Sequence, residues 1–284
     1  MISTAFEYSR ATSVDDALAK LRASNGEGKL IAGGHSLIPV MKFRLSEPKM
    51  LIDIGRIPEL SGIRKKGEKI EIGAGTVHHD VATSTLLRQE CPMLAEAAAT
   101  IGDPQVRNRG TLGGSIAHAD PSADYPAAML ALDADVHLKG PNGPRVVKAR
   151  DFFQGLFTVD LAADEILVAV QFAPVKAAAY AKLYQRASHF AIVGVAAALE
   201  MNKGIITSAR IGVTGASSHA TRLTDVEDAL AGKESSARAI ATAVRTAGAA
   251  LEDLNSDIHA SKEYRRAMIP VFTERALTAA LARQ

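Results

Sequence analysis

The chain has 284 residues, of which 47% are hydrophobic and 23% charged, and this composition is typical of a folded globular protein. At roughly 150 residues per domain, the length predicts about two domains. A net charge of +2, with no Lys/Arg-rich run, argues against a nucleic-acid-binding protein. A single cysteine excludes an internal disulfide, a thiolate zinc site and an iron–sulfur cluster held by this chain alone.

No targeting or membrane segment is expected. Residues 1–10 lack the charged-then-apolar pattern of a signal peptide. The longest apolar stretch, 191–199, is far shorter than the roughly 20 residues that a membrane helix needs. We therefore expect a cytoplasmic protein of mixed α and β structure without a transmembrane segment.

Helix signals recur through the first half of the chain. Ser13-Val14-Asp15-Asp16 is a capping-box-like start for a helix. The Ala- and Leu-rich stretch 76–100 predicts two short helices, broken at Pro92. Asp120-Pro121 is expected to open a further helix that ends near Leu132, because proline suits the first turn of a helix.

Strand signals alternate with these helices. Gly140-Pro141-Asn142-Gly143 predicts a hairpin turn between strands at 136–139 and 145–147. Short apolar runs predict further buried strands at 29–32, 50–54 and 69–72.

The pattern changes after Pro174. Three long antiparallel strands are expected, at 180–186, 193–201 and 205–213. From Thr224 onward the chain is expected to be helical, chiefly at 235–251 and 262–281. We therefore place a domain boundary near residue 175.

Two glycine loops are the strongest candidates for a ligand site. Ala32-Gly33-Gly34-His35-Ser36 follows a predicted strand and precedes a short helical run at 37–42. Thr111-Leu112-Gly113-Gly114-Ser115 is a second loop of the same kind. Paired glycines let backbone N–H groups approach a phosphate, and a helix N-terminus adds positive partial charge. Two such loops suit a diphosphate, although a Gly-Gly pair that stands alone more often serves only a tight turn.

The common nucleotide-binding motifs are absent. Gly73-Ala74-Gly75 is followed by His78 where a dinucleotide-binding fingerprint needs glycine. Gly232-Lys233 has Glu227 in place of the first glycine of a P-loop. A nucleotide would therefore be bound by another architecture.

Two segments identify such an architecture. "IAGGHSLIPVMKFRL" (31–45) and "TIGDPQVRNRGTLGGSIAHADPSAD" (100–124) resemble the FAD-binding medium subunit of the molybdenum hydroxylases, in the carbon monoxide dehydrogenase branch of the xanthine dehydrogenase family. The resemblance covers the whole chain. It implies an α+β protein with a two-lobed FAD-binding domain of the vanillyl-alcohol oxidase (PCMH) type at 1–175, with lobes at about 1–55 and 56–175. A small C-terminal α+β domain with a three-stranded antiparallel sheet and helices would follow at 176–284.

The same resemblance implies which residues contact the cofactor. The two glycine loops would wrap the FAD diphosphate, Asp124 would bond the ribose of the adenosine half, and Lys182 would reach the flavin. Ile101 would pack beside the cofactor. Phe190 stands where the branch has a tyrosine that shields the isoalloxazine ring, and Asp103 replaces a common histidine. The expected cofactor-binding residues are Ala32, Gly33, Gly34, His35, Ser36, Ile101, Thr111, Leu112, Gly113, Gly114, Ser115, Asp124, Lys182 and Phe190.

Other roles remain open for several of these residues. An acidic side chain such as Asp124, one turn into a helix, stabilises the helix dipole without any ligand. Phe190, judged on composition alone, is more typical of a core. Arg107 and Arg109 could bind phosphate but also pair with Asp103 or Glu96, so we leave them outside the site.

No metal, thiol or hydrolase site is expected. His78-His79-Asp80 are neighbours that would point to different sides of a helix, so we expect no metal site there. Cys91, beside Pro92, is expected to be a buried small apolar residue. No nucleophile motif of the Gly-x-Ser-x-Gly type is present to support a hydrolase.

The resemblance predicts an electron-transfer subunit with non-covalent FAD and no catalytic residues of its own. A large molybdenum-cofactor subunit would oxidise the substrate, such as carbon monoxide, an aldehyde or an N-heterocycle. A small subunit with 2Fe–2S clusters would pass electrons to this chain, and a quinone, O₂ or NAD would accept them. The complex would be a dimer of heterotrimers. The alternatives are a free-standing oxidase with FAD attached to His35, and a flavin-free structural subunit.

Overall fold

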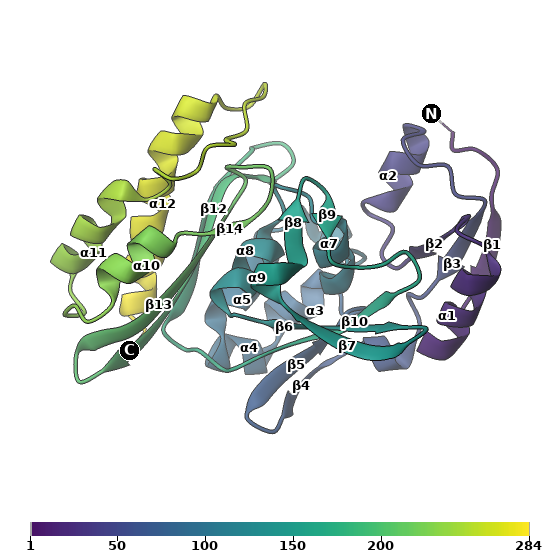
Figure 1. Ribbon diagram of the computed structural model, residues 1–284, viewed down its shortest axis with the longest axis horizontal. Helices are drawn as coiled ribbons and strands as arrows, with labels where there is room; N and C mark the ends of the chain where they lie inside the picture. The colour runs from purple at the N-terminus through teal and green to yellow at the C-terminus, as the bar shows by residue number, and fades with distance from the viewer. Residues whose placement is uncertain (1, 284) are drawn as a thin grey trace.

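The N-terminal lobe is a small parallel sheet with helices at its side (Figure 1). The computed structural model describes residues 2–283. The strands lie in the order β1-β3-β2, and β3 pairs in parallel with both neighbours. Ser13 caps α1 by accepting a 3.0 Å hydrogen bond from the Asp16 amide, so the predicted helix start is confirmed. The elements are β1 (Glu7–Arg10), α1 (Val14–Ala23), β2 (Gly28–Ile31), α2 (Leu37–Lys42) and β3 (Met50–Asp53).

A five-stranded antiparallel sheet forms the centre of the molecule. Its order is β4-β5-β10-β6-β7. The predicted hairpin is present as β6 and β7, whereas the central strand β10 was not predicted. The strands are β4 (Ile63–Lys66), β5 (Lys69–Gly73), β6 (Asp135–Gly140), β7 (Gly143–Lys148) and β10 (Ile166–Phe172), with a short pair formed by β8 (Phe153–Gly155) and β9 (Thr158–Val159).

The five-stranded sheet and the helices around it form the central lobe. These helices differ from the prediction at two places. The 76–100 stretch forms three helices, because Ser84 ends α3 and caps α4 with a 3.3 Å bond from the Leu87 amide. Residues 120–123 form a turn, so α8 begins at Asp124 rather than at Asp120-Pro121. The helical elements are η1 (Pro58–Leu60), α3 (His78–Thr83), α4 (Thr85–Glu90), α5 (Pro92–Ala99), α6 (Pro104–Arg107), α7 (Leu112–His118), α8 (Asp124–Ala131) and α9 (Ala149–Phe152).

The C-terminal part contains the three long antiparallel strands that the sequence predicts. A fourth short strand, β14, pairs with β13, so the expectation of a three-stranded sheet is wrong. β14 could not be predicted, because two residues are too few to show any alternation of apolar and polar side chains. The elements are β11 (Ala178–Tyr184), β12 (Ala191–Asn202), β13 (Ile205–Thr214), β14 (Thr221–Arg222), α10 (Thr224–Leu230), α11 (Ala237–Ala243), η2 (Val244–Thr246) and α12 (Lys262–Leu281).

This C-terminal sheet is buried on both faces. Along β12, Ala196 and Ala198 join the core of the central lobe, whereas Val195 and Ala197 join a second core with the C-terminal helices. This alternation follows from the two-residue period of a strand. β13 lies so close to α8 that a Cβ on Gly212 would come within 2.2 Å of the Ala127 carbonyl oxygen. On β11, Ala178 and Tyr180 likewise face the central lobe, whereas Ala179 and Ala181 face the second core.

Within residues 2–283, no helix is long and apolar enough to span a membrane.

Candidate cofactor-binding site

The two glycine loops, far apart in sequence, lie side by side. A Cβ on Gly33 would lie 2.1 Å from the carbonyl oxygen of Arg109, one residue before Gly110 and two before Thr111. The Cβ direction of Gly33 therefore points at the neighbouring backbone and not at a ligand. This glycine lets the N-terminal lobe approach the central lobe.

His78 is buried behind this contact. Its Nδ1 lies 3.1 Å from the Tyr125 hydroxyl, and a Cβ on Gly110 would come within 2.5 Å of its Nε2. Burial lowers the pKa of His78 to about 4, and the positive charges of His35 and Arg107 add to the effect. His78 is therefore neutral at neutral pH and fills the space behind the loops as a polar packing residue.

The first glycine loop has unsatisfied backbone donors. Within residues 2–283, the amides of Gly33, Gly34, His35 and Ser36 donate to no protein acceptor. Gly34 has φ +76°, which turns successive amides toward one side of the chain. The His35 ring lies 3.1 Å from the Gly33 carbonyl oxygen and is exposed. A run of free amides on an accessible loop can donate hydrogen bonds to an anion.

The second glycine loop is built differently. The Leu112 and Gly113 amides donate to Thr76 and Ala74, and the Gly114 amide donates to the Thr111 hydroxyl that caps α7. The predicted row of free amides is therefore absent here. A Cβ on Gly113 would strike Ala74 at 2.4 Å, whereas one on Gly114 would meet only the Thr111 Oγ1, at 2.8 Å. Gly114 is exposed and forms the open side of this loop.

Asp124 and Lys182 form a buried ion pair between α8 and β11. Their charged atoms are 2.8 Å apart, and their side chains are only 5% and 3% exposed. The Tyr180 hydroxyl donates to Asp124 over 2.5 Å, and Lys182 also donates to the Thr100 carbonyl over 3.2 Å. Burial raises the pKa of Asp124 and lowers the pKa of Lys182, while the attraction between them opposes both shifts. The two residues expected at different parts of the cofactor thus meet at one point.

Phe190 lies on the turn between β11 and β12. Its side chain is 50% exposed, so the alternative of a core position is wrong. From the same turn, His189 Nδ1 lies 3.0 Å from the carbonyl oxygen of Gly102, which follows Ile101. Ile101 is half-buried against the central core. The turn that carries Phe190 thus contacts the segment that carries Ile101.

The residues set aside during sequence analysis have structural partners or are exposed. Arg107 donates to the carbonyls of Ile101 and Gly102, and Arg109 is exposed. Cys91 is fully buried as expected, and burial raises its pKa to about 12. In the part of the chain that the structure describes, no group of three or more His, Cys, Asp or Glu side chains could hold a metal ion.

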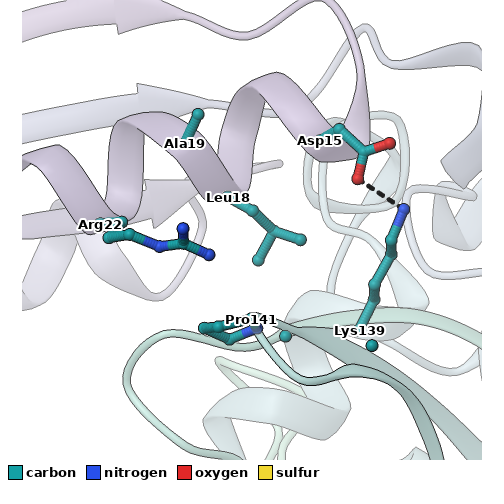
Figure 2. A pocket seen from close by; sticks show the side chains of 8 residues that line it. Asp15, Leu18, Ala19, Arg22, Lys139 and Pro141 are labelled. Carbon is teal, nitrogen blue, oxygen red and sulfur yellow. Dashed lines mark hydrogen bonds and ion pairs between the residues drawn. The ribbon is translucent and has the colours of Figure 1, made fainter.

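A separate surface pocket of about 320 Å³ lies between α1 and the β6–β7 hairpin. Figure 2 shows Asp15 and Lys139 in contact at one side of it, and their charged atoms form a 2.6 Å ion pair. None of its lining residues belongs to the expected cofactor site.

Comparison with known proteins decides the family. Residues 4–174 match the FAD binding domain in molybdopterin dehydrogenase, and residues 178–280 match the CO dehydrogenase flavoprotein C-terminal domain. The carbon monoxide dehydrogenase medium chain of Hydrogenophaga pseudoflava is 41% identical over 100% of this chain and 99% of its own length. The chain belongs to the family of FAD-binding medium subunits of molybdenum hydroxylases. It is therefore a subunit of an oxidoreductase.

Two further similarities agree with this family. The 6-hydroxypseudooxynicotine dehydrogenase complex subunit alpha of Paenarthrobacter nicotinovorans is 39% identical over 98% of this chain and 95% of its own length. The solved carbon monoxide dehydrogenase from Hydrogenophaga pseudoflava, which lacks the Mo-pyranopterin moiety, has a TM-score of 0.95 and 42% identity over 100% of this chain and 99% of that chain. The fold is thus the two-domain FAD-binding fold of these medium subunits.

The residues of the first loop fit the FAD of this family. A diphosphate requires several hydrogen-bond donors at one place, and the free amides of Gly33 to Ser36 supply them. The open backbone face at Gly114 lets a second segment approach the same group closely.

Two polar side chains outside the expected set, Tyr180 and His189, contact segments that carry expected residues, at Asp124 and at Gly102. Tyr180 lies two residues before Lys182 on β11 and shares its face, so the period of a strand could have predicted its contact with Asp124. His189 had no comparable signal, because its partner Gly102 is 87 residues away in sequence.

Proposed function

We propose that this chain is the subunit through which electrons leave a molybdenum hydroxylase complex. A small subunit with 2Fe–2S clusters delivers electrons, and a quinone, O₂ or NAD removes them. FAD, when bound, supplies the one- and two-electron redox chemistry for this exchange. The observation that carries the proposal is the row of unsatisfied amides at Gly33 to Ser36, set beside the second glycine loop.

Different parts of the chain contribute to different parts of the proposed cofactor site. Residues 1–175 form a FAD-binding domain of the vanillyl-alcohol oxidase type, with lobes at about 1–55 and 56–175, and residues 176–284 form the C-terminal domain. The two glycine loops hold the diphosphate between these lobes. Lys182 and Phe190 complete the site from the C-terminal side, where β11 and the turn after it contact the central lobe.

The partners follow from chemistry that this chain lacks. Iron–sulfur clusters need several thiolates, and Cys91 is a single buried thiol whose pKa is raised to about 12. The clusters and the molybdenum cofactor therefore belong to a small and a large partner subunit, assembled as a dimer of heterotrimers. We place this complex in the cytoplasm, where a chain without disulfides is typical.

The substrate is chosen in the molybdenum subunit. Relatives of nearly equal similarity are named for carbon monoxide and for 6-hydroxypseudooxynicotine. This flavin subunit therefore serves a common role behind different oxidation reactions.

One experiment separates non-covalent FAD from FAD attached to His35. Acid precipitation of the purified protein should release all of the yellow colour into the supernatant. Flavin that stays on the precipitated chain would contradict the proposal and support the covalent oxidase. A colourless protein that takes up no added FAD would support the flavin-free structural subunit.

A second experiment tests the electron-transfer role. The flavin-loaded chain alone should pass electrons from a chemical reductant to a dye. It should not be bleached anaerobically by carbon monoxide, aldehydes or N-heterocycles until the large and small subunits are added. Bleaching of the single chain by any of these substrates would refute the subunit role.

A further inference from the structure

Three successive carbonyl groups beside the expected flavin position are held by side chains. Lys182 donates to the Thr100 carbonyl over 3.2 Å, and Arg107 donates to the Ile101 and Gly102 carbonyls over 2.9 and 3.2 Å. His189 Nδ1 lies 3.0 Å from the same Gly102 carbonyl. Because a carbonyl oxygen only accepts, His189 must carry its proton on Nδ1.

His189 is held in position by its own turn. Its backbone has φ +61°, a left-handed conformation that is uncommon for residues other than glycine, although asparagine, aspartate and histidine adopt it more often than the rest. Its amide donates to the Gln185 carbonyl over 2.8 Å, and its ring packs edge-on against Tyr184 at 5.2 Å. The uncommon backbone conformation aims the imidazole at Gly102 and leaves the next side chain, Phe190, exposed.

We propose that His189 is a positioning residue, which locks the Phe190 turn to the 100–102 segment and thereby retains the flavin between them. The inference rests on the proposed function, which puts Ile101 and Phe190 beside the cofactor. Lys182 and Arg107 fix the 100–102 segment to β11 and α6, and among the hydrogen bonds within residues 2–283 only that of His189 ties it to the turn that carries Phe190. Without this bond the two segments separate independently, and the flavin is released faster.

The test uses three variants at one position. In His189→Asn, the amide Nδ2 occupies the place of the imidazole Nδ1 and can donate, and asparagine tolerates the left-handed backbone. His189→Asp has the same shape but only accepts, and His189→Ala removes the group. Lys203→Ala is the control. Lys203 has φ +50° in the turn at the other end of β12, so this variant measures what alanine costs in a left-handed backbone conformation away from the site.

The first readout is retention of FAD by the full chain, measured as the dissociation constant and release rate from flavin fluorescence. Loss of one hydrogen bond should weaken retention about five-fold in His189→Ala and His189→Asp. His189→Asn and Lys203→Ala should stay within about two-fold of the wild type. Equal retention in all four variants would overturn the proposal, and so would loss in His189→Asp alone, which would indicate a charge effect.

The second readout needs no flavin. Amide hydrogen exchange of the flavin-free chain at 100–103 and 185–190 should be faster in His189→Ala and His189→Asp, and unchanged in His189→Asn. Unchanged exchange in all variants would overturn the lock even if FAD binds. If the wild-type chain binds no FAD but the variants show this exchange pattern, the proposed function is refuted and the lock is supported.

Discussion

Removing the charge of Asp124 should destabilise the protein strongly, because it leaves a buried ammonium without its partner. Asp124→Asn keeps the shape of the side chain and the partner hydroxyl of Tyr180. It takes away the carboxylate that lies 2.8 Å from Lys182, whose side chain is only 3% exposed. Burial already lowers the pKa of Lys182, so losing the opposing charge lowers it further.

The magnitude follows from the burial. Breaking a buried pair by removing one partner costs about 3–5 kcal/mol. With an unfolding entropy of about 2.1 cal/mol/K per residue, this loss lowers the melting temperature by roughly 5–8 °C for a chain of this length. The matched control is Glu90→Gln, which removes the 2.9 Å pair with Lys65, whose side chain is 57% exposed. That change should cost less than about 1 kcal/mol.

Calorimetry of the flavin-free chain is the assay, so that cofactor loss does not enter the result. Asp124→Asn combined with Lys182→Met removes both charges and should recover part of the loss. A shift for Asp124→Asn no larger than that for Glu90→Gln would refute the reasoning. It would mean that Lys182 finds water or another acceptor once its partner is gone.

Other positions give further expectations. Gly33→Ala should lower the free energy of unfolding by about 1–3 kcal/mol, because its Cβ would lie 2.1 Å from the Arg109 carbonyl oxygen. Gly155→Ala, whose Cβ would meet nothing closer than 3.9 Å, should change it by less than about 0.5 kcal/mol in the same denaturant titration. Burial lowers the pKa of His78 to about 4, below the value of about 6.5 in the unfolded chain. The stability that the neutral form contributes is therefore complete above pH 6.5 or so and is lost as the pH falls toward about 4. The wild type should therefore lose about 3 kcal/mol more than His78→Gln over that range, and parallel stability curves would contradict this. Cys91, fully buried with its pKa raised to about 12, should react with a thiol reagent only in denaturant; rapid labelling of the native chain would show that it is accessible.

The candidate site could be predicted in its parts but not in its arrangement. The glycine pairs are local features, and the strand–loop–helix pattern around Gly33 is visible in the sequence. The difference between the two loops is not local. The amides around Gly113 are occupied by Ala74 and Thr76, which belong to a distant segment, so only the fold shows that the free amides belong to the first loop.

The sequence alone predicted the helices and strands that have a periodic apolar pattern or are bounded by a cap or a turn. The helix capped by Ser13, the β6–β7 hairpin and the three long C-terminal strands all have local signals of capping, turn or alternation. β10 was not predicted although a turn closed by the Glu165 amide on the Ala162 carbonyl precedes it, because periodicity alone does not distinguish a short apolar run in a strand from one in a buried helix. Its central position in the sheet results from pairing with β5 and β6.

The pairing of distant residues was decided by tertiary structure. Asp124 and Lys182 are 58 residues apart, and each has an ordinary local role: a helix start for one and a strand position for the other. They meet because the alternate residues of β11 face the central lobe, which places Lys182 against the start of α8 away from water. The sequence determined which face each side chain would take, and the packing of the C-terminal sheet on α8 determined what that face would touch.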